Sequence, residues 1–285
     1  MHKAFEIDGP ARIEVRLASG EIVVDPTLEG RIEVELTAHD DESQRLVDNA
    51  RIELNDRNLV VDVPNKRGGF TFSIGFGRQG ITCRIRCPRS SALAVVRSKS
   101  ADVVVRGTIG GLNVSTASGD VEADRIEGAL NVKSASGDTR VHEVLGSTSV
   151  QTASGDIDLE IVRGPANVTS VSGDVKIGEA YDDVSANTVS GDQEHGAVMI
   201  GKVAAHSVSG DVTIGVRRGS KVYLDCNTVS GETSSELELT TDAPAGDGPL
   251  VEIRAKTVSG DIRITRAAAP VPSNGSSNTA QEVHA

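Results

Sequence analysis

The tripeptide Ser-Gly-Asp returns at a fixed spacing of 18 residues through the middle of this 285-residue chain. Ser-Ala-Asp at 100–102 stands one period before the first copy, and after the fifth copy the spacing lengthens to 19, 21 and 29 residues. A period this regular, without a helical pattern, indicates a solenoid of stacked β coils. The repeat assigns these residues to tight corners: Gly119, Asp120, Gly137, Asp138, Gly155, Asp156, Gly173, Asp174, Gly191, Asp192, Gly210 and Asp211.

Alignment of the periods predicts which side chains point inward. Small apolar and β-branched residues recur four residues before each Ser and three and five residues after it, in the alternation typical of half-buried strands. Each coil should therefore consist of two or three short strands, stacked in parallel on the next coil about 4.8 Å away. The polar columns that contain Thr116 and Ser118 are also expected inside, where hydroxyl groups of successive coils would bond to one another. A further apolar column holds Ile126, Val144, Val162, Ala180 and Val198.

The corner residues have distinct expected roles. Gly suits a turn through positive φ, which is costly for a residue with a Cβ atom. Asp is expected to accept hydrogen bonds from nearby backbone N–H groups and so close the corner. Stacked carboxylates about 5 Å apart repel one another, which makes a ladder of bound cations the alternative. One carboxylate per coil supplies too few oxygen ligands for calcium, so corner capping is favoured and no metal site is assigned.

Residues 1–80 differ from the repeat and predict a small β-rich cap. Alternating strands are expected in 11–25, where a Ser-Gly pair resembles an early copy of the corner, in 31–38 and, as a hairpin, in 51–63. An N-cap candidate and acidic residues predict a short helix at 40–50. Such a cap would cover the first coil, whose unpaired backbone could otherwise join edge to edge with another molecule.

The Gly-rich end of the cap carries three of the four phenylalanines of the chain, Phe70, Phe72 and Phe76. These aromatic residues are candidates for a partner-binding surface, and the alternative is a flap that seals the cap against the solenoid. A phosphate-binding loop is not expected, because the segment lacks the Gly-Lys-Ser/Thr ending that such loops need.

The predicted solenoid covers residues 81–266, and a disordered tail without an apolar pattern follows at 267–285. The 29-residue interval before Ser259 predicts a polar loop or an extra hairpin that protrudes from the far end of the solenoid. Residues 251–265 are expected to supply the closing strands.

Composition and charge exclude several classes of protein. The net charge of −12 argues against binding to nucleic acid, since phosphate contacts need clustered Lys and Arg. No apolar run approaches the ~20 residues of a membrane span, and acidic residues interrupt the N-terminus before an apolar signal region forms, so a cytoplasmic protein is predicted. Cys83 and Cys87 should lie on one face of a strand roughly 13 Å apart, too far for a disulfide. These residues and Cys226 are expected to be buried or edge thiols.

No constellation of residues predicts catalysis or a cofactor. Polysaccharide lyases and hydrolases also use parallel β-helices, but their clefts carry aromatic platforms and paired acids, and aromatic residues are almost absent from these coils. His142, His195 and His206 belong to different coils. His195 stands beside Gln193 in an inward column, where a buried or half-exposed histidine is expected, with metal binding or pH sensing as the alternative. The sequence therefore predicts a protein that is not an enzyme.

The corners TASGDV, SASGDT, TASGDI and TVSGD resemble those of the bacterial β-strand-repeat proteins grouped as putative adhesins under domain of unknown function 4097. The segments KVYLDCNTVSGE and VEIRAKTVSGDIRITR extend the likeness, which covers residues 5–266. The resemblance implies a parallel β-solenoid with no established enzymatic activity. These motifs are structural, so they identify a fold and leave the biological role open.

Together these observations predict an all-β protein: a parallel β-helix of ~18-residue coils, with right-handed coils favoured, and an N-terminal β-rich cap with one short helix. The predicted function is a non-enzymatic scaffold or protein-interaction module, whose protein partner would bind the sheet faces or the phenylalanine segment. One alternative is a bactofilin-like filament protein that associates through its coil ends. The other is a carbohydrate-binding or carbohydrate-active β-helix.

Overall fold

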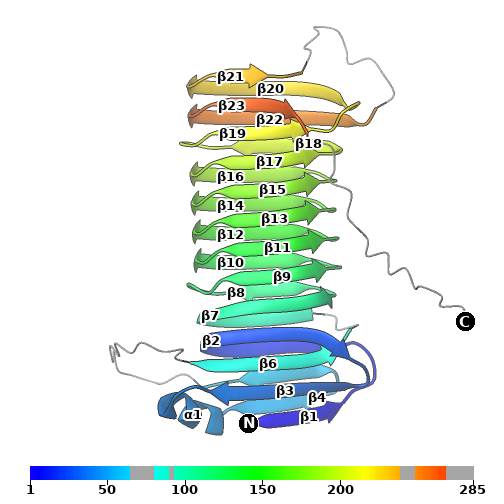
Figure 1. Ribbon diagram of the computed structural model, residues 1–285, viewed down its shortest axis with the longest axis vertical. Helices are drawn as coiled ribbons and strands as arrows, with labels where there is room; N and C mark the ends of the chain where they lie inside the picture. Colours follow the sequence, from blue (N-terminus) through cyan, green and yellow to red (C-terminus); the bar gives the residue numbers. More distant parts are fainter. Residues whose placement is uncertain (65–79, 90–92, 238–247, 268–285) are drawn as a thin grey trace, which may run out of the picture.

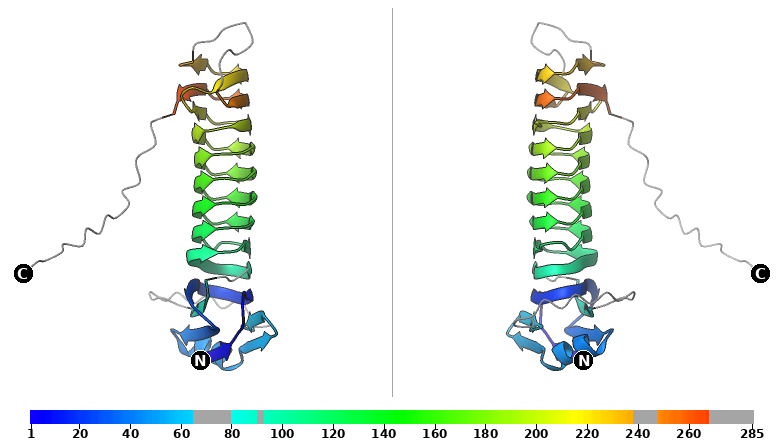
Figure 2. Two further views of the ribbon diagram at one scale, coloured as in Figure 1. Left: turned by 90° about the vertical axis from the view of Figure 1, so that its right-hand side faces the viewer. Right: turned by 90° about the vertical axis from the view of Figure 1, so that its left-hand side faces the viewer.

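The computed structural model describes residues 1–64, 80–89, 93–237 and 248–267. These residues form a tall stack of β coils above a smaller β layer that holds the N-terminus (Figure 1). Seen from the side, two sheets face each other along the stack (Figure 2). The predicted all-β solenoid with a β-rich cap and one short helix is confirmed.

Each regular coil contributes one strand to each sheet, and strands of successive coils pair in parallel with like residues opposite each other, as in Val132, Val150 and Val168. The fixed period therefore sets the register. The first sheet contains β8 (Leu112–Ser115), β10 (Leu130–Ser136), β12 (Thr148–Ser154), β14 (Ala166–Ser172), β16 (Val184–Ser190) and β18 (Gly201–His206). The second contains β9 (Val121–Ile126), β11 (Thr139–Val144), β13 (Ile157–Val162), β15 (Val175–Ala180), β17 (Gln193–Val198) and β19 (Val212–Val216).

The interior of the stack is filled by the predicted aliphatic columns, all of which are buried. The hydroxyl column is buried at Thr152, Ser170 and Thr188, as expected. The prediction for the Ser118 column is wrong, because this serine and its counterparts are exposed. The two-residue alternation breaks where the chain turns, so a side chain at the corner points away from the space between the sheets.

At the N-terminal end, β2 (Arg12–Leu28) runs as one 17-residue strand where two were expected, and pairs in parallel with β7 (Leu93–Ile109). On its other side β2 pairs with β5 (Asn58–Asp62) and β6 (Ile81–Pro88). Its Ser-Gly pair lies opposite Ser100 and Ala101, which makes this strand the first coil of the stack.

A further set of elements, here called the N-terminal layer, lies below β2: β1 (His2–Glu6), β3 (Arg31–Ala38), β4 (Arg51–Asn55), β5, β6 and α1 (Asp41–Asp48). The predicted helix and hairpin are both present. Asp40 caps α1 by accepting a hydrogen bond from the Ser43 N–H at 2.7 Å, and β4 pairs with β5 in antiparallel orientation. No helix among the described residues is long and apolar enough to cross a membrane, since α1 has eight residues.

At the C-terminal end, the order of the coils in space departs from their order in the chain. β22 (Leu250–Ser259) and β23 (Ile262–Arg266) pair with β18 and β19 on one side, and with β20 (Lys221–Ser230) and β21 (Thr233–Ser235) on the other. The expectation that 251–265 close the solenoid is therefore wrong. The last coil in sequence is inserted below the preceding one, and β20 with β21 ends the stack (Figure 1).

Candidate interaction surface at the corner edge

The corner aspartates form a ladder along one edge of the stack. The Oδ1 atom of Asp138 accepts a hydrogen bond from the backbone N–H of Asp156 at 2.9 Å, and the same contact recurs between neighbouring coils. We expected each Asp to close its own corner, but it bonds to the corner of the adjacent coil. The N–H of Asp156, and next the Arg140 side chain, lower the pKa of Asp138. In spatial order the ladder joins Asp102, Asp120, Asp138, Asp156, Asp174, Asp192, Asp211, Asp261 and Glu232.

The corner glycines allow the coils to approach each other closely at this edge. Gly155 has φ of 130°, and a Cβ atom there would lie 2.4 Å from the carbonyl oxygen of Gly137. At Gly119 no positive φ is involved, yet a Cβ would lie 2.0 Å from the Ala101 oxygen. Positive φ therefore explains glycine in the later coils, whereas contact between backbones explains it throughout.

The Asp ladder leads to a first prediction. Asp156→Ala should destabilise the protein by about 1 kcal/mol, because it removes the acceptor for the Asp174 N–H at an edge that water can reach. Asp156→Asn keeps an acceptor oxygen and removes one charge from the ladder, so its free energy of unfolding should stay within about 0.5 kcal/mol of wild type. Urea denaturation at neutral pH compares the two. Equal losses would contradict a role for the Asp156 acceptor oxygen.

A row of exposed valines runs beside the ladder. Each residue directly precedes a corner Ser, and because the Ser or Thr before it points inward, its own side chain points out. Neighbouring corner serines pair between coils, which places these valines one strand spacing apart, about 4.8 Å. The exposed fraction is 46–49% in four of them and 79% in the last. In spatial order this valine row consists of Val171, Val189, Val208, Val258 and Val229.

The two sheets beside the valine row differ in the outward side chains they carry. On the second sheet, charges alternate from coil to coil where Arg140, Asp158, Lys176 and Glu194 lie opposite one another. On the first sheet the outward positions of β14 and β16 are uncharged, as in the column Asn131, Ser149, Asn167 and Ser185, whereas β18, β22 and β20 carry outward charges such as Lys202, Arg254 and Asp225. The apolar row is therefore bordered by charges on the second sheet, and on the first sheet by neutral polar groups beside Val171 and Val189 and by charges farther along.

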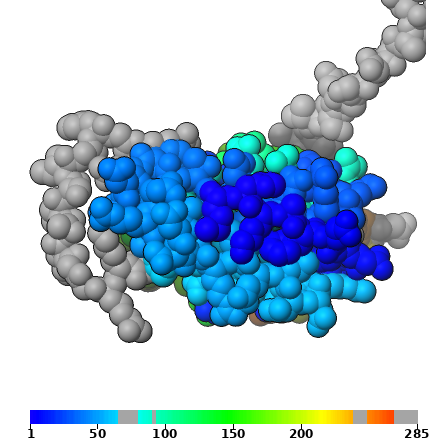
Figure 3. Space-filling view, turned by 90° about the horizontal axis from the view of Figure 1, so that it is seen from below, coloured from blue at the N-terminus to red at the C-terminus, as the bar shows by residue number. Residues whose placement is uncertain are grey.

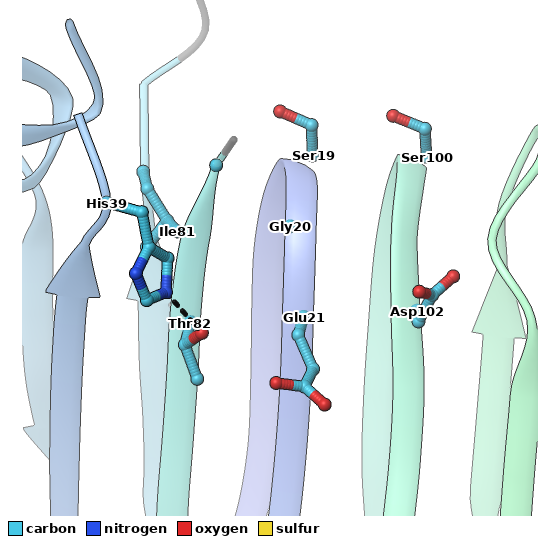
Figure 4. A pocket seen from close by; sticks show the side chains of 9 residues that line it. Ser19, Gly20, Glu21, His39, Ile81, Thr82, Ser100 and Asp102 are labelled. Atoms are coloured by element: carbon cyan, nitrogen blue, oxygen red, sulfur yellow. Dashed lines mark hydrogen bonds between the residues drawn. The ribbon is translucent and has the colours of Figure 1, made fainter. Parts of the chain in front are cut away.

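A hollow of about 290 Å³ lies at the other end of the same edge, between β2, β6 and β7. Figure 4 shows Ser19 and Ser100 on the neighbouring strands β2 and β7, with the His39 ring directed at Thr82. His39 Nε2 and Thr82 Oγ1 are 2.9 Å apart. The Asp102 carboxylate that lines this hollow already accepts the Asp120 N–H, so it belongs to the ladder. No group of three or more His, Cys, Asp or Glu within the described ranges has the arrangement of a metal site.

The other singled-out residues lie apart from this edge. His195 is buried in β17, neither ring nitrogen has a hydrogen-bond partner, and burial lowers its pKa to about 4. His142 pairs with Glu160 on the surface of the second sheet. Cys83 and Cys87 are buried in β6 as expected, and burial raises the pKa of Cys83 to about 12.

The phenylalanine segment was predicted from the sequence as a binding surface, whereas the valine row was not. Phe70, Phe72 and Phe76 lie outside the described residues. The valine row was missed from the sequence, although the signal was present. The residue before the corner Ser changes from Ala in the earlier copies to Val in the later ones. The change from Ala to Val indicates an apolar surface row only when this position is known to be exposed.

The comparisons with known proteins concern nearly the whole chain. A family model described as Toastrack DUF4097 matches residues 11–265. No curated protein matches. A crystal structure of a putative adhesin from Bacteroides fragilis NCTC 9343 is similar, with a TM-score of 0.52, 14% identity, and coverage of 93% of this chain and 96% of that one. A putative lipid binding protein from Parabacteroides distasonis ATCC 8503 aligns with a TM-score of 0.46, 14% identity, and coverage of 93% and 96%. At these identities the likeness concerns the fold.

Proposed function

This chain belongs to the Toastrack DUF4097 family, and we propose that it is a non-enzymatic interaction module that binds a protein partner along the valine row. The observation that carries the proposal is the unbroken line of exposed apolar side chains from Val171 to Val229. Single exposed apolar residues are ordinary on a protein surface, but a contiguous row bordered by polar groups is typical of an interaction site.

The rigidity of the edge supports the proposal. The corner glycines leave no room for a Cβ atom between coils, and each ladder bond ties one corner to the next. The valines are therefore held in fixed positions before a partner arrives, which reduces the side-chain and backbone entropy lost on binding. The expected partner presents apolar side chains in a line, bordered by charges that complement those of the second sheet.

The proposal predicts a strong effect of charge in the valine row. Val189→Glu combined with Val208→Glu should abolish capture of the partner from lysate of the native host, because two carboxylates would lose their water against an apolar surface. The free energy of unfolding should fall by no more than about 1 kcal/mol, since both side chains are about half exposed and the two new carboxylates repel each other across one strand spacing.

Ala129→Glu is the matched control. Ala129 is exposed in the turn between β9 and β10, at the opposite ends of the strands from the corner edge. This variant adds a carboxylate of the same kind and should retain the partner. Quantitative mass spectrometry of the captured proteins compares the variants. Loss of the same protein from Ala129→Glu, or its retention by the double variant, would refute the proposed surface.

We also propose that the protein lies in the cytoplasm, the location predicted from the sequence. The thiols of Cys83, Cys87 and Cys226 are compatible with a reducing compartment. Fractionation of the native host with an antibody to this chain tests the location independently of the binding surface. The chain should be recovered with the cytoplasmic fraction.

A further inference from the structure

The two ends of the stack are finished differently. The end that carries the N-terminus is covered by residues of the N-terminal layer, drawn in blue tones in Figure 3. At the other end, β20 pairs with β22 alone among the described strands. Its inward side chains Val222, Leu224 and Cys226 are half-buried, whereas the residues opposite them on β22 are fully buried. Among the residues that the structure describes, no further coil covers the inner face at β20.

Within the described ranges, no strand pairs with the outer side of the β20 backbone. The Lys221 N–H donates to the Pro249 carbonyl oxygen at 2.9 Å, which directs Lys221 toward β22. Backbone groups of alternate residues in a strand point to opposite sides, so those of Val222, Leu224 and Cys226 point away from β22. An edge of this kind is a template for pairing with a further strand.

The corner at this end carries Glu in place of Asp, which affects the kind of strand that can pair next. Corners within the stack carry an Asp whose carboxylate accepts the N–H of the next corner. The last corner carries Glu232, which donates its N–H to Asp261 and has a longer side chain in place of the Asp acceptor. The ladder therefore ends here, and the edge is not suited to another parallel coil in the same register.

We propose that β20 pairs with β20 of a second copy of this chain in antiparallel orientation, with the two-fold axis at Tyr223. A rotation about an axis normal to the first sheet reverses the strand and keeps its inner face inward, so the two interiors join. This register places Val222 opposite Leu224 inside. Outside, it places Tyr223 opposite itself and Lys221 opposite Asp225, which gives two ion pairs per dimer.

Neighbouring registers are less favourable. A shift that centres the axis on Asp225 places this carboxylate opposite its own copy. A shift to Leu224 leaves Lys221 opposite Asn227 and forms no ion pair. Because the N-terminal layer covers the other end, the same edge meets itself and growth stops at two copies. The outcome is a closed dimer, in contrast to a filament that grows through both ends.

Charge exchange on the exposed side of β20 tests both the dimer and its register. Sedimentation of the full chain over a concentration series should reveal a reversible monomer–dimer equilibrium. Asp225→Lys and Lys221→Asp should each weaken the dimer by roughly tenfold, because each converts two attractions into two repulsions. The double variant Lys221→Asp with Asp225→Lys should restore the wild-type dissociation constant. Circular dichroism confirms that each variant keeps the β fold.

A second variant reports the position of the axis directly. Tyr223→Cys, made together with Cys226→Ser, should form a disulfide-linked dimer under mild oxidation, because opposed residues of such a pair without mutual hydrogen bonds have Cα atoms about 4.5 Å apart. Asp225→Cys in the same background should not. A protein that stays monomeric at every concentration would overturn the proposal. Assemblies larger than a dimer, or failure of the double variant to recover, would overturn it as well.

Discussion

Replacing Gly155 with alanine should destabilise the protein by about 2 to 6 kcal/mol, the largest effect expected of any exposed-edge substitution. Two costs combine at this position. A φ of 130° is a conformation that residues with a Cβ atom rarely adopt, which costs about 1–3 kcal/mol. The new Cβ would also lie 2.4 Å from the carbonyl oxygen of Gly137, so the two coils would have to separate, at a further cost of about 1–3 kcal/mol.

Gly219→Ala is the matched control for backbone strain. Gly219 has φ of 83°, but no atom lies within 4 Å of the position that its Cβ would occupy. This variant should lose about 1 kcal/mol through strain alone. Guanidinium denaturation of wild type and the two variants gives the comparison. A loss at Gly155 no greater than the loss at Gly219 would contradict the close contact between coils at the corner edge.

Stability of the wild-type protein should fall by roughly 2 kcal/mol between about pH 7 and about pH 5, mainly because of His195. Its folded pKa is about 4, against 6.5 for an exposed histidine, because burial disfavours the charged ring. In this interval the unfolded chain binds a proton that the folded protein does not. The contribution is fully present above the unfolded pKa and is lost as the pH falls toward the folded one.

His195→Leu should remove this dependence. The inward column places His195 between Ile177 and Ile214, and both ring nitrogens lack partners, so an aliphatic side chain of similar size forfeits no hydrogen bond. At neutral pH the variant should be more stable than wild type by about 1 kcal/mol. Urea denaturation at a series of pH values provides the test.

The carboxyl groups with lowered pKa, such as Asp138 and Glu143, change the stability of the protein only at lower pH. Their stabilisation is lost as pH falls through folded pKa values that lie below the usual 3.8 and 4.5. The interval above about pH 5 therefore isolates the histidine. An unchanged pH slope in His195→Leu would show that His195 is not the group responsible.

Much of the fold could be predicted because the repeat is a one-dimensional pattern. A fixed period places like residues opposite each other in successive coils, so a column read from the sequence becomes a column in space, as with Val132, Val150 and Val168. The cap helix and hairpin were predictable from local signals, the Asp40 N-cap and the turn that includes Asp56 at positive φ.

The order of the last two coils was not predictable from the period. Repeats specify that coils stack, but the same inward pattern lets either coil lie next to β18. The corner residues do distinguish the two. Asp261 can accept an N–H from a further coil and lies inside the stack, whereas Glu232 ends the ladder. The difference between Asp and Glu at the corner predicts the order of the coils only when the hydrogen bonds are known to run between coils.

The candidate surface was missed for a related reason. Alternation predicts which strand residues face inward, but it fails at the corner, where both Val189 and Ser190 are exposed. A change from Ala to Val could not be recognised as an apolar row while the orientation of the corner was unknown. The sequence led instead to the aromatic residues Phe70, Phe72 and Phe76, because aromatic side chains are common at interfaces.

The central claim is that a protein partner binds the valine row, and site-specific photo-crosslinking in the native host tests it most directly. A photoreactive amino acid at Val208 or Val258 should form a covalent adduct with one and the same protein. At Ala129, in the turn between β9 and β10, it should form none with that protein. Adducts of equal yield from Ala129, or none from either valine, would contradict the account.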